Sequence, residues 1–110
     1  MGDLNYAAEK FWGALGSLAR PGRDTKERLH AAFMHFHPIR PEDFDDPELR
    51  TGFEEIMRRL RAKKATGGEG DVPATIAAMS EEEAGAVSQL IVEFCHLIEL
   101  ERRAQAKRAK

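Results

Sequence analysis

The longest helical pattern in this chain runs from Ser80 to Lys110, and it constrains the fold more than any other segment. Ser80 is a residue type that caps helices, and Glu83 follows three residues later, where a glutamate completes a capping box. Apolar residues then recur at three- and four-residue steps, as on the buried face of an amphipathic helix. They are Ala84, Val87, Leu90, Ile91, Phe94 and Ile98. The rest of the chain must supply the helices that cover this face.

Shorter helical patterns precede the long one, and each has its own start and stop signals. An aspartate stands at the start of three of them, in the position where its side chain can accept hydrogen bonds from the first turn. Prolines follow the first two, and glycine-rich sequence follows the third. The expected helices run from Asp3 to Leu18, from Asp24 to His37 and from Asp46 to Lys64, with a short helical turn from Pro73 to Met79.

These patterns predict an all-α fold: a small antiparallel four-helix bundle with a long C-terminal helix. No segment alternates as a strand does, and the 110 residues match the size of a single helical domain, residues 1–110. We expect the side chain of Ile39 or Phe44 to be buried and to anchor the connector after the second helix to the core. The stretch from Ala65 to Asp71 contains three glycines and is the expected flexible loop.

The charges are unevenly distributed along the chain. The net charge is −2, but residues 101–110 hold five cationic residues and one glutamate. A negative body repels polyanions, so any contact with nucleic acid or an acidic partner is confined to this end, through Arg102, Arg103, Lys107 and Arg108. The main interpretation of residues 101–110 is nevertheless a frayed basic helical tail whose cations suit the negative end of the helix dipole.

The expected compartment is the cytoplasm, with no contact with a membrane. Residues 1–10 contain no long apolar run, so neither a signal peptide nor a membrane anchor is expected there. The apolar-rich stretch from Leu90 to Leu100 is too short to span a bilayer. Cys95 is the single cysteine and cannot form an internal disulfide. We expect it to be a reduced, buried hydrophobic residue.

Histidines and glutamates do not assemble into a metal site on the expected helices. His35 and His37 would lie roughly 160° apart around the helix, and His30 and His37 about 10.5 Å apart along it. The Glu93–His96 pair is expected to face away from the core. We therefore predict no metal, no cofactor and no small-molecule ligand, and expect the three histidines of the second helix to be partly buried at the edge of the core.

One spacing resembles a known catalytic motif. Arg28 and His35 are separated by six residues, which is similar to the Arg-x4-6-His signature of the HEPN helical ribonucleases. In that family the arginine and the histidine act at a composite site formed across a dimer. Leu29 occupies a position where the family usually has a polar residue. The resemblance implies an alternative function as a metal-independent ribonuclease or toxin-like enzyme, with Arg28 holding phosphate and His35 moving a proton.

A second apolar strip lies on the long helix, on the side away from its core face. Val92, His96 and Leu100 form this strip, and a helix that is apolar on two sides is usually covered on both. The main hypothesis is therefore a non-enzymatic helical module for protein–protein interaction or regulation, which associates with itself or with another protein through its last helix. Tethering to nucleic acid through the basic tail is a further alternative.

Overall fold

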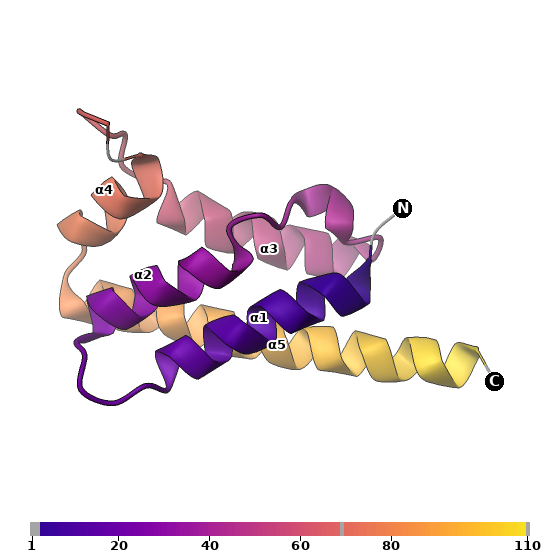
Figure 1. Ribbon diagram of the computed structural model, residues 1–110. Coiled ribbons are helices and arrows are strands. Elements are labelled where there is room, and N and C mark those ends of the chain that lie inside the picture. The colour runs from indigo at the N-terminus through magenta and orange to yellow at the C-terminus, as the bar shows by residue number, and fades with distance from the viewer. Residues whose placement is uncertain (1–2, 69, 110) are drawn as a thin grey trace.

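A computed structural model describes residues 3–68 and 70–109 of the chain. Glu69, which falls in the expected flexible loop, and Lys110, which ends the expected basic tail, lie outside the described residues, as do Met1 and Gly2. The fold is all-α, as predicted, and the described residues contain no strand (Figure 1). The helices are α1 (Leu4–Leu18), α2 (Thr25–Phe36), the 3-10 turn η1 (Pro41–Asp43), α3 (Pro47–Leu60), α4 (Asp71–Ala78) and α5 (Glu81–Arg108).

The caps that the sequence predicts begin four of these helices. Asp3, Asp24 and Asp46 each accept a hydrogen bond from the backbone N–H three residues later, at 2.8–3.1 Å. At the start of α5, Ser80 Oγ accepts from the Glu83 N–H at 3.0 Å, and the Glu83 carboxylate accepts from the Ser80 N–H at 3.2 Å. Because these bonds satisfy N–H groups that have no partner inside the helix, they fix where each helix begins.

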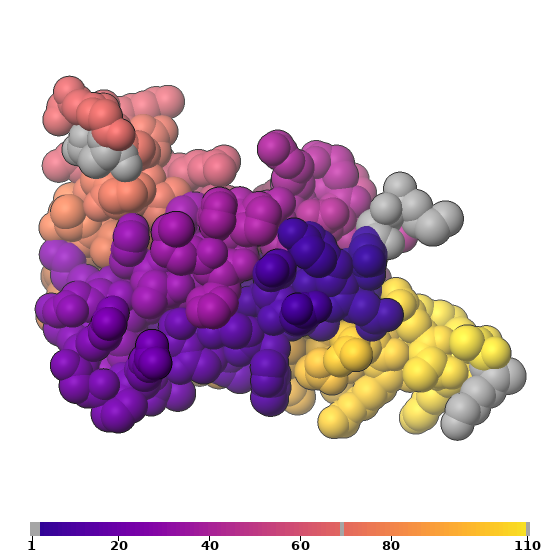
Figure 2. All heavy atoms as spheres, in the orientation of Figure 1, coloured from indigo at the N-terminus to yellow at the C-terminus, as the bar shows by residue number. Residues whose placement is uncertain are grey.

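The four long helices run in alternating directions, and α5 passes along the whole molecule (Figure 1). It packs against α1, α2 and α3, while the short α4 bridges α2 and α3 at one end. The predicted short turn before α5 is thus a two-turn helix that begins at Asp71, two residues earlier than expected. The C-terminal end of α5 extends beyond the start of α1, so its last turns project from the body (Figure 2).

A cluster of phenylalanines holds the bundle together. The Phe11 ring stacks on Phe36 with ring centroids 4.5 Å apart, and it meets Phe94 and Phe53 edge-on at 5.0 and 6.2 Å. Phe44, in the connector, packs on Phe53 and Phe94 at 5.3 and 5.5 Å. The cluster thereby joins α1, α2, α3, α5 and the connector. Phe44 and Ile39 are both buried, as expected.

The histidines of α2 are more exposed than the sequence suggested. His30, His35 and His37 are all exposed rather than partly buried, and a His37 ring nitrogen lies 2.9 Å from the Met34 carbonyl oxygen. The expectation was wrong because α2 buries only the narrow stripe of Leu29, Ala32 and Phe36. The three histidines lie outside that stripe and remain largely open to water, although the His35 ring contacts Gly13 of α1.

Candidate functional site

Large apolar side chains are exposed mainly on two neighbouring helices. On α1, Trp12 is 69% exposed, and on α5, Val92 and Leu100 are 38% and 46% exposed. Trp12 follows the buried Phe11 and Val92 follows the buried Ile91, so each is rotated about 100° from the core-facing position of its helix. Both residues therefore point outward from helices that are themselves anchored in the core.

A hollow of about 260 Å³ lies between α1 and α5. Trp12 and Leu15 line it from α1, Val92 and His96 line it from α5, and Phe11, Cys95 and other residues complete the lining. Leu100 does not line the hollow and lies about one turn farther along α5. We refer to Trp12, Val92, His96 and Leu100 as the α1–α5 surface.

Three of these four residues follow from the helical pattern of the sequence. Val92, His96 and Leu100 are exposed on α5, as the second apolar strip requires. Trp12 lies on the flank of the apolar stripe of the first helix, and nothing in the sequence shows which flank of one helix meets which side of another. The structure places Trp12 at the same hollow as Val92 and His96.

Cys95 lies beneath this surface and is buried, as predicted. Its Sγ donates a hydrogen bond to the Phe11 carbonyl oxygen at 3.5 Å, which links α5 to α1. Burial raises the pKa of the Cys95 thiol to about 11. Since the thiolate is the reactive form, Cys95 acts near neutral pH as a small packing residue.

The four basic residues proposed to contact nucleic acid or an acidic partner fall into two pairs. Arg102 binds the Glu99 carboxylate at 2.6 Å and Asn5 Oδ1 at 3.2 Å, and Arg108 binds Glu101 at 2.8 Å. The side chains of Arg103 and Lys107 form no hydrogen bond or ion pair within residues 3–68 and 70–109. Helix α5 continues through all four residues to Arg108, and fraying of this end stays a prediction.

Arg28 and His35 occupy opposite parts of α2. The Arg28 guanidinium turns back toward the α1–α2 connection, where it donates to the Arg23 carbonyl oxygen at 2.9 Å and the Arg20 carbonyl oxygen at 3.5 Å. The His35 ring instead packs on Gly13 of α1. Seven residues of helix separate the two positions by about 10.5 Å, and no hydrogen bond joins their side chains in the described part of the chain.

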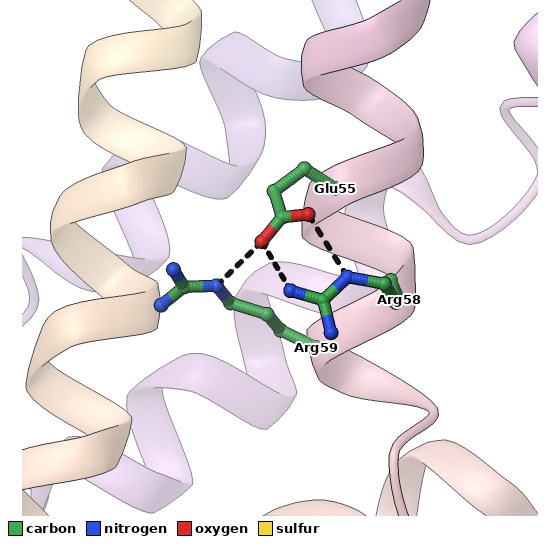
Figure 3. Close-up of polar contacts among 3 residues, drawn as sticks. All are labelled: Glu55, Arg58 and Arg59. Carbon is green, nitrogen blue, oxygen red and sulfur yellow. Dashed lines mark hydrogen bonds and ion pairs between the residues drawn. The ribbon is translucent and has the colours of Figure 1, made fainter.

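Three charged residues on α3 form ion pairs with one another. The Glu55 carboxylate accepts hydrogen bonds from Arg58 at 2.6 and 2.9 Å and from Arg59 at 2.9 Å, so both guanidiniums turn toward it (Figure 3). The Arg58 hydrogen bonds, followed by that from Arg59, lower the pKa of Glu55 to about 2. Two of the cations at the C-terminal end of α3 are thus satisfied locally.

The described residues hold neither a candidate metal site nor a candidate membrane span. Residues 3–68 and 70–109 contain no group of three or more His, Cys, Asp or Glu side chains arranged to hold a metal ion. Within the same residues, no helix has both the length and the apolar content needed to cross a bilayer. No protein-family model, curated protein or solved structure matches the chain.

Proposed function

We propose that this chain is a small helical interaction module that associates with a second copy of itself through the α1–α5 surface. The observation that carries the proposal is the position of Trp12, which is 69% exposed beside Val92 and His96 at the edge of an apolar hollow. Tryptophan is among the residues that contribute most to protein interfaces, where it typically inserts into pockets near the centre.

The physical basis is the removal of apolar surface from water. Covering apolar side chains contributes about 25 cal/mol for each Å² removed from solvent. Trp12 on α1 and Val92 and Leu100 on α5 offer such surface, and the hollow offers space for a side chain of the second copy. Large exposed apolar patches typically mark interaction sites, whereas single exposed hydrophobic residues need no explanation.

The surface is also held rigidly. Phe11 and Ile91, which precede Trp12 and Val92, are 1% and 0% exposed, so the backbone on both sides of the hollow is fixed by the core. A surface that is ordered before binding loses little conformational entropy on association. This favours binding between preformed helices over coupled folding and binding.

Light scattering coupled to size exclusion, over a series of protein concentrations, tests the proposal. The wild-type chain should approach twice its monomer mass of 12.3 kDa as concentration rises. Leu100→Asp and Trp12→Ala should shift the equilibrium to monomer. Met34→Asp is the matched control, because Met34 is 53% exposed on α2, outside the α1–α5 surface, and should leave the dimer intact.

A wild-type chain that stays monomeric at every concentration would overturn this function. An equal loss of dimer in Met34→Asp would also count against the surface. We further propose that the module acts in the cytoplasm, on the sequence argument that its single cysteine needs no oxidising compartment.

A further inference from the structure

We infer that the second copy binds antiparallel to the first along α5, with a two-fold axis at His96, so that the acidic start of each helix meets the basic end of the other. This inference rests on the proposed self-association and specifies its geometry. It derives from the distribution of apolar and charged residues along one exposed side of α5.

The residues concerned share one side of the helix. At 100° per residue, they fall within about 80° of one another around α5. They are Glu82, Val92, His96, Leu100, Arg103 and Lys107, and all six are exposed. We refer to them as the outer strip of α5. From Glu82 to Lys107 the strip extends for about 37 Å at 1.5 Å per residue. It therefore covers most of the 49 Å length of the molecule.

The apolar part of the strip is symmetric about His96. Val92 lies four residues before His96 and Leu100 four residues after it. In an antiparallel pair centred on His96, Val92 of each copy stands opposite Leu100 of the other. The same surface is then used on both copies, as a closed two-fold dimer requires. Gln89 of one copy falls opposite Arg103 of the other in this register.

The charges favour the same orientation. The side chains of Glu81 and Glu82, like those of Arg103 and Lys107, form no hydrogen bond or ion pair with the described residues. Antiparallel pairing brings Lys107 of the second copy within about one turn of Glu82. Parallel pairing would instead align each charge with its own counterpart, and like charges across an interface oppose binding. The dipoles of two neighbouring helices also attract each other when the helices are antiparallel.

The projecting end of α5 is available to contact the second copy in this geometry. Beyond Ile98, α5 contributes no residue to the buried core, and its last turns extend past the body of the molecule (Figure 2). In the antiparallel dimer this end lies along the first half of the partner's α5. The C-terminal end of α5 in each copy thus covers an exposed side of α5 in the other copy.

Site-specific cross-linking tests the orientation in the full-length chain. In a Cys95→Ser background, Gln89→Cys and Arg103→Cys variants are treated with a short bismaleimide, separately and as an equimolar mixture. The mixture should yield a cross-link between positions 89 and 103, identified by mass spectrometry of the joined peptides, and neither variant alone should cross-link. His96→Cys, at the two-fold axis, should cross-link to itself.

Exchange of the charges provides a second measurement. Arg103→Glu with Lys107→Glu should raise the dissociation constant of the dimer at least tenfold at low salt. Mixing this variant with Glu81→Lys combined with Glu82→Lys should restore association. A parallel dimer would not be weakened by either exchange alone, since each replaces one set of like-charge contacts by another.

The outcomes separate this inference from the proposed function. A dimer in which position 89 cross-links to itself is parallel and overturns the antiparallel geometry. A dimer by light scattering that shows no cross-link at 96 or between 89 and 103 uses another face, which also overturns it while self-association stands. A chain that remains monomeric removes both proposals.

Discussion

The His35 imidazole lies directly against Gly13, so closely that a Cβ on this glycine would stand 2.6 Å from Nδ1 of His35. This contact joins the last turn of α2 to α1. Real Cβ atoms do not approach other heavy atoms so closely, so only glycine fits here with the ring in its present position. Gly16, one turn later on α1, has nothing within 4 Å of the equivalent point. A close approach to α1 therefore occurs at Gly13 and not at Gly16.

Alanine substitutions at the two glycines should therefore have different effects. Gly16→Ala should stabilise the fold by up to about 1 kcal/mol, because alanine favours the helix and meets no neighbour. Gly13→Ala should gain less or lose stability, because the His35 ring must move. Urea unfolding of both variants measures the difference. In a His35→Ala background, Gly13→Ala should raise the free energy of unfolding as Gly16→Ala does. If Gly13→Ala and Gly16→Ala alone raised it equally, the contact between Gly13 and His35 would be contradicted.

Adjacent residues of α1 should differ sharply in their contribution to stability. Phe11→Ala removes the ring at the centre of the phenylalanine cluster and should cost about 3–5 kcal/mol. Trp12→Ala removes a larger side chain that is 69% exposed and should change the free energy of unfolding by less than about 1 kcal/mol. Both are measured at a protein concentration low enough to keep the chain monomeric. Similar losses in the two variants would show that Trp12 supports the fold itself.

Cys95 should react slowly while the chain is folded. Its pKa of about 11 leaves so little thiolate at pH 8 that an aromatic disulfide reagent should react about 100-fold more slowly than with the denatured chain. Because folding favours the protonated thiol, this contribution to stability is complete below the unfolded pKa and is lost as pH rises toward 11. Cys95→Ser should therefore reduce the loss of stability between about pH 9 and pH 11, as followed by thermal unfolding. A fast reaction in the native state would contradict the burial.

Glu55 should remain ionised in acid that protonates ordinary carboxylates. Carbon NMR of its carboxyl group should give a midpoint near pH 2, and Arg58→Ala should move that midpoint toward the ordinary value of 4.5. Any stabilisation from this cluster is present above the unfolded pKa and is lost as pH falls toward 2. The cluster is exposed, so the effect on unfolding should be small. An unchanged midpoint in Arg58→Ala would contradict the assigned cause.

Local signals in the sequence accounted for the helices and most of their starts. Asp3, Asp24, Asp46 and Ser80 act within three residues of themselves, so their capping role can be predicted from spacing alone. The prediction was less accurate where the outcome depended on packing between helices. The exposure of the three α2 histidines is one example, since it depends on how narrow a stripe the neighbouring helices cover.

The same contrast between local signals and packing applies to the candidate site. Helical periodicity is enough to show that α5 is apolar on a second side, because it gives the positions of Val92, His96 and Leu100 around the helix. The place of Trp12 beside them, and the hollow between α1 and α5, instead depend on how the helices pack. The physical reason is that periodicity fixes where a side chain points on its own helix. Which helices become neighbours depends on contacts between distant residues, such as those of Phe11 with Phe36 and Phe94.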